Sequence, residues 1–80
     1  MSRLPPVSGA EVARLLVESL GYQFVRQRGS HARYALTTPV GAHHITIPMH
    51  SVVAKGTLND ILRQISLKTG LSRDELINRL

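Results

Sequence analysis

The sequence of 80 residues contains no cysteine and no tryptophan, so disulfides are excluded as a source of stability. A chain of this size buries only about 60% of the surface that its unfolded form exposes, so its core must be thin. Hydrophobic residues nevertheless make up 42% of the sequence, which predicts a folded domain and argues against disorder. We expect one domain that spans residues 1–80.

Long apolar runs are also missing. No stretch approaches the roughly 18 apolar residues that a membrane span needs. The first residues, MSRLPPVSG, contain two prolines and no apolar run of the kind found in a secretory signal. We therefore expect a cytoplasmic protein without a membrane partner, and the lack of cysteine fits a reducing compartment.

Acidic side chains are absent from the middle of the chain. The five carboxylates are Glu11, Glu18, Asp60, Asp74 and Glu75. All four histidines lie between Glu18 and Asp60, together with several basic residues, and the formal net charge is +5. Because the acids are missing from one continuous region, we favour an anion-binding face over a basic surface that only maintains solubility.

Three segments show the apolar spacing of helices, and each begins with a capping signal. Capping boxes with a Ser and a Glu three residues later precede the first and third helices, whereas Thr57–Asp60 is interpreted as the cap of the second. A glycine suited to the left-handed conformation follows each of the first two. The predicted helices are residues 9–20, a second that begins at the Thr57 cap and ends at Gly70, and a short third after Ser72.

The segment between the first two helices predicts three strands. They are residues 22–27, 31–37 and 43–48, with turns at 28–30 and 38–41. In the second strand Ala32 and Tyr34 lie on one face, and His31 and Arg33 lie on the other. The sequence therefore predicts an α+β fold of order α-β-β-β-α-α, with helices on one face of a three-stranded antiparallel sheet.

Several candidate functional residues map to one end of this sheet. His31 begins the second strand and His50 follows the third, and an antiparallel meander places these two points at the same end. Arg28 lies in the hairpin at that end, Arg33 shares the face of His31, and Lys55 leaves from the same side. The start of the second helix adds free N–H groups there.

This set of groups suits a phosphodiester. RNA supplies its own nucleophile, the 2′-hydroxyl, and histidine, with an unperturbed pKa of about 6.5, serves as acid or base near neutral pH. Arginine and lysine hold non-bridging oxygens, so no metal or other cofactor is required. Gly29 and Ser30 form a tight turn that leaves room for a ligand beside His31.

Plainer interpretations remain open for these residues. His31 and His50 also suit an exposed surface, Tyr34 suits the core better than stacking on a base, and Arg33 could simply maintain solubility. Ser30 as a nucleophile is disfavoured because no nearby carboxylate would orient a base.

A metal site is also disfavoured. Adjacent strand residues point to opposite faces, so His43 and His44 do not readily share one ion. No cysteine or carboxylate completes a ligand set with them.

The stretch GSHARY, residues 29–34, resembles the HicA-type toxins of toxin–antitoxin pairs. The resemblance extends over Ser8–Leu20, Gly21-Tyr22, Val25-Arg26, Ile47-Pro48, His50, Gly56–Leu58, Ile61-Leu62, Gly70–Ser72 and Glu75-Leu76. It implies a fold similar to double-stranded-RNA-binding domains and a metal-independent ribonuclease that cleaves mRNA and blocks translation. The essential histidine of the Gly-Ser-His motif carries over to His31, and a cognate HicB-type antitoxin is expected to cover the active site.

Our leading prediction is thus an mRNA-cleaving toxin with His31 as general acid or base and His50 in the opposite proton transfer. Arg28, Ser30, Arg33 and Lys55 are expected to bind phosphate, an assignment that comes from their placement and not from the resemblance. Two alternatives are a non-catalytic RNA-binding module of the same fold and a mainly structural half of an antitoxin complex.

Overall fold

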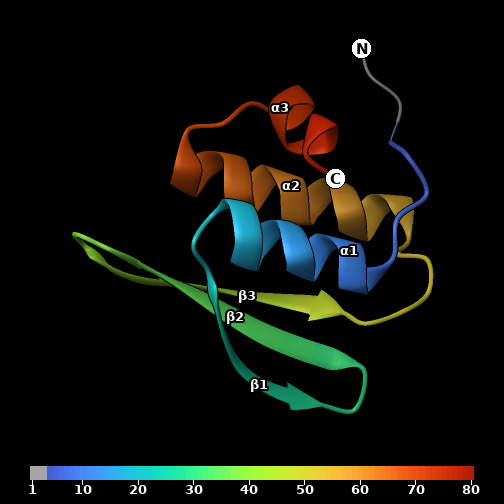
Figure 1. Ribbon diagram of the computed structural model, residues 1–80, viewed down its shortest axis with the longest axis horizontal. Helices are drawn as coiled ribbons and strands as arrows, with labels where there is room; N and C mark the ends of the chain where they lie inside the picture. The colour runs from blue at the N-terminus through green and yellow to red at the C-terminus, as the bar shows by residue number, and fades with distance from the viewer. Residues whose placement is uncertain (1–3) are drawn as a thin grey trace.

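The computed structural model describes residues 4–80. A three-stranded antiparallel sheet in the order β1-β2-β3 carries helices on one face, and α3 packs against α2 (Figure 1). This confirms the predicted α+β class and the element order. The elements are α1 (Gly9–Arg14), η1 (Leu15–Ser19), β1 (Gln23–Arg28), β2 (His31–Thr38), β3 (Gly41–Pro48), α2 (Lys55–Thr69) and α3 (Arg73–Asn78).

The core lies between the sheet and the helices. Ala32 and Tyr34 of β2 and Ile45 and Ile47 of β3 are buried, whereas the residues between them face outward or are only partly covered. The predicted alternation and the core position of Tyr34 are therefore confirmed. Among the larger side chains, those fully buried are Val12, Leu16, Tyr22, Ile47, Leu58, Leu62, Ile65 and Leu76. No helix within residues 4–80 has both the length and the apolar character to cross a bilayer.

The first helix begins and ends close to its predicted bounds. Ser8 accepts a hydrogen bond from the Glu11 amide, and the Glu11 side chain returns one from the Ser8 amide, which completes the predicted capping box. The last turn widens into the π-helical segment η1, which the apolar spacing did not predict. The chain then leaves through Gly21, whose φ of 81° is left-handed as expected.

The second helix begins earlier than predicted. Its N-cap is Ala54, which makes no side-chain hydrogen bond, so the assignment of Thr57 as the cap is wrong. Val53 is buried and its amide bonds to the Val7 carbonyl, which fixes the chain immediately before the helix. The Ala54 carbonyl then accepts the Leu58 amide, so the first helical bond forms without a capping side chain. Thr57 consequently lies in the first turn and is exposed.

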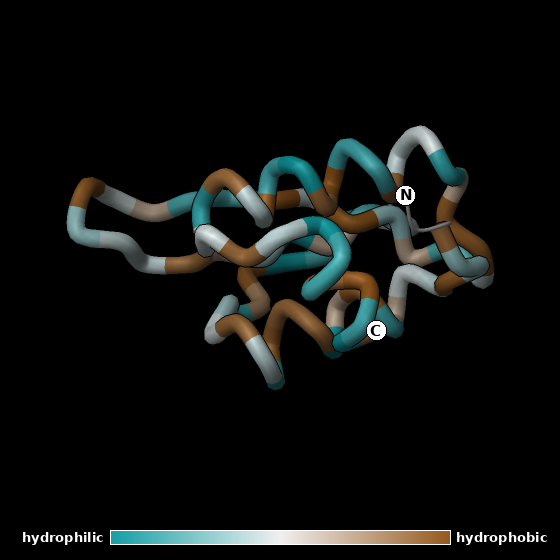
Figure 2. Tube along the Cα trace, turned by 90° about the horizontal axis from the view of Figure 1, so that it is seen from above, coloured by the Kyte–Doolittle hydropathy of each residue, from teal (hydrophilic) through white to brown (hydrophobic). Residues whose placement is uncertain are grey.

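The two hairpin turns are tighter than predicted. Arg28 pairs with His31 as a strand residue, so only Gly29 and Ser30 connect β1 and β2. Gly29 has a φ of 55°, the positive value that one class of two-residue hairpin needs at its first central position. The second hairpin projects beyond the helices (Figures 1 and 2), and Val40 in its turn is 94% exposed.

The segment after β3 is held to the rest of the fold by backbone hydrogen bonds. The Met49 amide donates to the Ser30 carbonyl at 2.5 Å, and the Gly9 amide donates to the His50 carbonyl at 2.9 Å. Gly9 also packs directly on this segment, because a Cβ at Gly9 would collide with the Pro48 carbonyl oxygen and lie 2.7 Å from the Met49 Cα. The start of α1 therefore fixes the path of the chain that carries His50.

Gly9→Ala should destabilise the fold by about 1–3 kcal/mol, because the new methyl group can be accommodated only if backbone moves. The matched variant is Gly56→Ala, where a Cβ meets nothing within 4 Å. It should stabilise α2 by roughly 0.5–1 kcal/mol. Urea unfolding followed by circular dichroism measures both, and a neutral Gly9→Ala would contradict the close approach.

A side-chain hydrogen bond joins the other end of the sheet to the chain after η1. The Tyr22 hydroxyl lies 2.7 Å from Nδ1 of His43, and the two rings meet edge to face. Burial raises the pKa of Tyr22. The pKa of His43 is lowered by burial, with smaller contributions from the charges of Lys68 and His44. A neutral His43 ring lets the Tyr22 hydroxyl donate and Nδ1 accept.

The lowered pKa of His43 predicts that the fold becomes less stable as the pH falls. The unfolded chain takes up this proton near its ordinary pKa of about 6.5, whereas the folded chain takes it up only at lower pH. The contribution of neutral His43 to the free energy of unfolding is therefore complete above a pH of about 6.5 and decreases as the pH falls below that value. Urea midpoints at pH 7.5 and 5.5 should differ less in His43→Gln than in the wild type, whereas His44→Gln should retain most of the difference. An unchanged difference in His43→Gln would contradict the assignment.

Candidate functional site

A β-bulge decides which side chains of β1 reach the open face of the sheet. Phe24 pairs with Tyr34, but the next pair is Arg26 with Arg33, so Val25 is the extra residue. Paired residues share a face, so Phe24 lies on the covered side, where its ring meets that of Tyr34 at 5.7 Å. Beyond the bulge the alternation is inverted, and Arg26 joins Arg33 on the open face.

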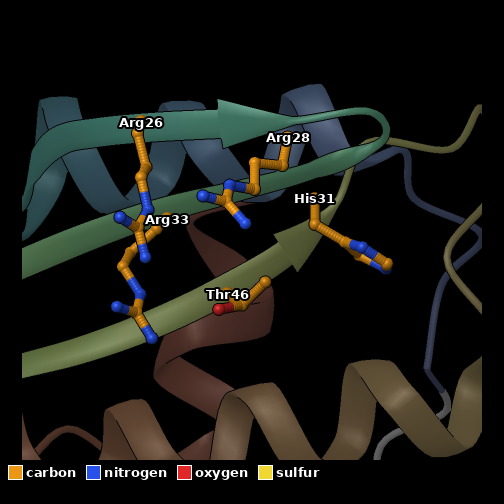
Figure 3. A pocket seen from close by; sticks show the side chains of 5 residues that line it. All are labelled: Arg26, Arg28, His31, Arg33 and Thr46. Atoms are coloured by element: carbon orange, nitrogen blue, oxygen red, sulfur yellow. The ribbon is translucent and has the colours of Figure 1, made fainter.

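This inversion gathers three arginines over one hollow. The hollow has a volume of about 190 Å³ and is lined by Arg26, Arg28, His31, Arg33 and Thr46. Figure 3 shows the three arginine side chains extending over the same part of the sheet, with Thr46 on the neighbouring strand. Arg28 reaches this face because it pairs with His31. We call this site the arginine hollow.

The arginine hollow has no acidic partner. Within residues 4–80, the ion pairs join Arg63 to Asp60 and Arg73 to Asp74, and neither involves these three arginines. Three neighbouring cations without a counter-charge repel one another, and an anion placed among them removes that cost. The hollow is therefore suited to an anionic ligand with several oxygens, because guanidinium groups form paired hydrogen bonds with such groups.

A second hollow adjoins the first at His31. Its volume is about 390 Å³ and its lining is His31, Thr46, Pro48, His50, Ala54 and Thr57. The His31 ring points away from the arginines (Figure 3). The second hollow thus lies between the end of β3 and the first turn of α2, and it brings His31 and His50 together as their predicted positions implied. We call it the histidine hollow.

Two other predicted residues lie outside both hollows. Ser30 is exposed, and its carbonyl accepts the Met49 amide, so the structure gives its backbone an anchoring role. Lys55 lines a separate hollow with Leu4, Pro5 and Pro6. The expected grouping of Lys55 with His31 is therefore not observed. Because α2 begins at Lys55, the helical turn places Ala54 and Thr57 at the histidine hollow and directs Lys55 elsewhere. Phosphate binding by Ser30 or Lys55 stays a prediction.

The remaining histidines lie toward the other end of β3. His43 pairs with Leu36 and bonds to Tyr22, whereas His44 pairs with Ala35 and is exposed. Within the described residues, no group of three or more His, Asp or Glu side chains could hold a metal ion.

Three lining residues were not predicted from the sequence. Strict alternation from Phe24 would place Arg26 on the covered face, and the bulge that reverses this is visible only in the pairing with β2. Thr46 was given no role. Thr57 was interpreted as a helix cap, and its place in the histidine hollow follows from the earlier start of α2.

Together the two hollows form a continuous site with two distinct chemistries. The arginine hollow offers fixed positive charge, and the histidine hollow offers two imidazoles and two hydroxyls. His31 lines both, so one imidazole borders the positively charged part and the neutral part of the site.

The comparisons with known proteins agree with this picture at the level of the family. The family model described as "HicA toxin of bacterial toxin-antitoxin" matches residues 9–67, which include both hollows. No curated protein and no solved structure matched the chain. Because the match covers well over half of the chain, this protein belongs to the HicA toxin family and is the toxin of a toxin–antitoxin system, with a cognate antitoxin as its partner.

Proposed function

We propose that this toxin is a metal-independent endoribonuclease that cleaves mRNA and thereby blocks translation. The observation that carries the proposal is the position of His31, which lines both the arginine hollow and the histidine hollow. A phosphate held by the arginines would lie beside one imidazole, and a second imidazole would be available across the histidine hollow. This is the arrangement that two coupled proton transfers need.

The proposed reaction uses the nucleophile of the substrate. One imidazole removes the proton of the ribose 2′-hydroxyl, whose oxygen then forms a bond to the adjacent phosphorus. The bond from phosphorus to the 5′-oxygen breaks, and the other imidazole protonates that oxygen as it leaves. The products are a 2′,3′-cyclic phosphate and a free 5′-hydroxyl. His31 and His50 take these two roles, and no metal ion is needed to generate the nucleophile.

The arginines supply the electrostatic part of the mechanism. Negative charge increases on the non-bridging oxygens as the 2′-oxygen attacks, and neighbouring guanidinium groups stabilise this charge. Arg28 and Arg33 were expected to do this, and Arg26 joins them because of the bulge. A HicB-like antitoxin that covers this face would block the site, and acidic side chains on it would offset the uncompensated positive charge.

His31→Ala should reduce cleavage of a long mRNA by about 10²–10⁴-fold, the usual contribution of a general acid or base. RNA affinity should change little, since all three arginines are retained. His44→Ala is the matched control, because His44 lies on the same strand face as Thr46 but outside both hollows. Equal cleavage by wild type and His31→Ala would contradict the proposal. Binding without cleavage by the wild type would instead favour the non-catalytic RNA-binding module.

Arg33→Gln should weaken RNA binding and make it less dependent on salt. For single-stranded nucleic acid, the slope of log K against log salt changes by about 0.7 for each phosphate contact. We expect a reduction of that size, measured by fluorescence anisotropy across a salt series. Arg14→Gln, at an exposed position on α1, should leave the slope unchanged. Equal slopes for Arg33→Gln and wild type would exclude a phosphate contact at Arg33.

A further inference from the structure

The histidine hollow differs from the arginine hollow in a way that catalysis alone does not require. Apart from the shared His31 and Thr46, its lining consists of Pro48, His50, Ala54 and Thr57, and it contains no arginine or lysine. Its volume of about 390 Å³ is roughly twice that of the arginine hollow. It lies within the range of about 300–1,000 Å³ that small-ligand sites occupy.

We propose that the histidine hollow binds the base of a nucleotide adjoining the phosphate at His31, and that the substrate is therefore single-stranded RNA. This inference rests on the proposed function, because it places the reacting phosphate between the two hollows. A phosphodiester has a nucleoside on each side, so a strand whose phosphates follow the arginines carries one neighbouring nucleoside toward the end of β3.

The lining of the histidine hollow matches the chemistry of a nucleobase. A base has two flat, apolar faces and an edge of hydrogen-bond donors and acceptors. The Pro48 ring and the Ala54 methyl group supply apolar contact, and the His50 ring can stack on a base. The hydroxyls of Thr46 and Thr57 can donate to and accept from its edge. Thr57 is well placed for this role because it is exposed in the first turn of α2.

Base binding in this hollow requires an unpaired nucleotide. In a duplex the bases stack and pair inside the helix, and A-form RNA presents mainly phosphates and 2′-hydroxyls to a protein. A base enters the hollow only when it is already single-stranded or is turned out of the stack at additional cost. The likeness of the fold to double-stranded-RNA-binding domains therefore does not extend to the substrate in this proposal.

The test measures binding without cleavage. The probe is a short, single-stranded, fully 2′-O-methylated RNA, which lacks the nucleophilic hydroxyl, and each base in turn is removed to leave an abasic site. Fluorescence anisotropy of the full chain should show a loss of roughly tenfold in affinity at one position and much smaller losses elsewhere. Uniformly small losses would overturn the proposal and would indicate that the hollow holds phosphate or sugar.

A variant that fills the hollow makes the test specific to it. Ala54→Leu places a larger side chain at an exposed lining residue, so the base should already be excluded and the abasic effect should disappear. Ala42→Leu makes the same change at an exposed residue near the other end of β3 and should retain the effect. If Ala54→Leu still lost as much affinity as the wild type at that abasic position, the proposal would also be overturned.

Cleavage and base binding are measured with different RNAs, so each can be lost without the other. Cleavage is measured with natural RNA. The base contact is measured with the 2′-O-methylated probe, which a ribonuclease of this mechanism cannot cut. If the protein cleaves RNA but no single abasic position lowers its affinity more than the others, it is a ribonuclease without this base site. If one abasic position lowers the affinity but natural RNA is not cleaved, the protein is an RNA-binding module that contacts a base.

Discussion

The contact between Gly9 and the Pro48–Met49 backbone is the constraint on which the site depends. Only a residue without a side chain fits there, and the Gly9 amide then reaches the His50 carbonyl. Met49 is held from the other side by Ser30, whose neighbour is His31. These bonds join the start of α1, the β1–β2 hairpin and the end of β3 at one point. The separation of His31 and His50 is therefore set by backbone and not by flexible side chains.

A second constraint, the bulge at Val25, determines the electrostatics of the same end. It allows one strand to place Phe24 against the Tyr34 ring on one face and yet present Arg26 and Arg28 with Arg33 on the other. The same edge strand is covered little by helices, and all of its residues are exposed. The apolar core is formed mainly by β2, β3 and the helices, whereas the charged face on the opposite side of the sheet takes Arg26 and Arg28 from β1 and Arg33 from β2.

Much of this organisation follows from local sequence rules. Two capping boxes, glycines after helices and the alternation in β2 and β3 were sufficient to predict the fold class and to place His31 and His50 at one end. The errors arose where a long-range contact decides a local feature. Buried Val53, bonded to Val7, starts α2 before Thr57, and this moves Lys55 away from the site. Likewise, no pairing register is visible in the sequence, so the outward turn of Arg26 was not predicted.

In the proposed reaction the RNA itself supplies the nucleophile and two imidazoles transfer the protons. The most direct test is to identify the ends that the purified toxin leaves on an RNA incubated in excess EDTA. We expect 2′,3′-cyclic phosphate ends, open to phosphatase only after hydrolysis of the ring, and 5′-hydroxyl ends that a polynucleotide kinase can label directly. Ends bearing a 5′-phosphate, or cleavage abolished by the chelator, would contradict it.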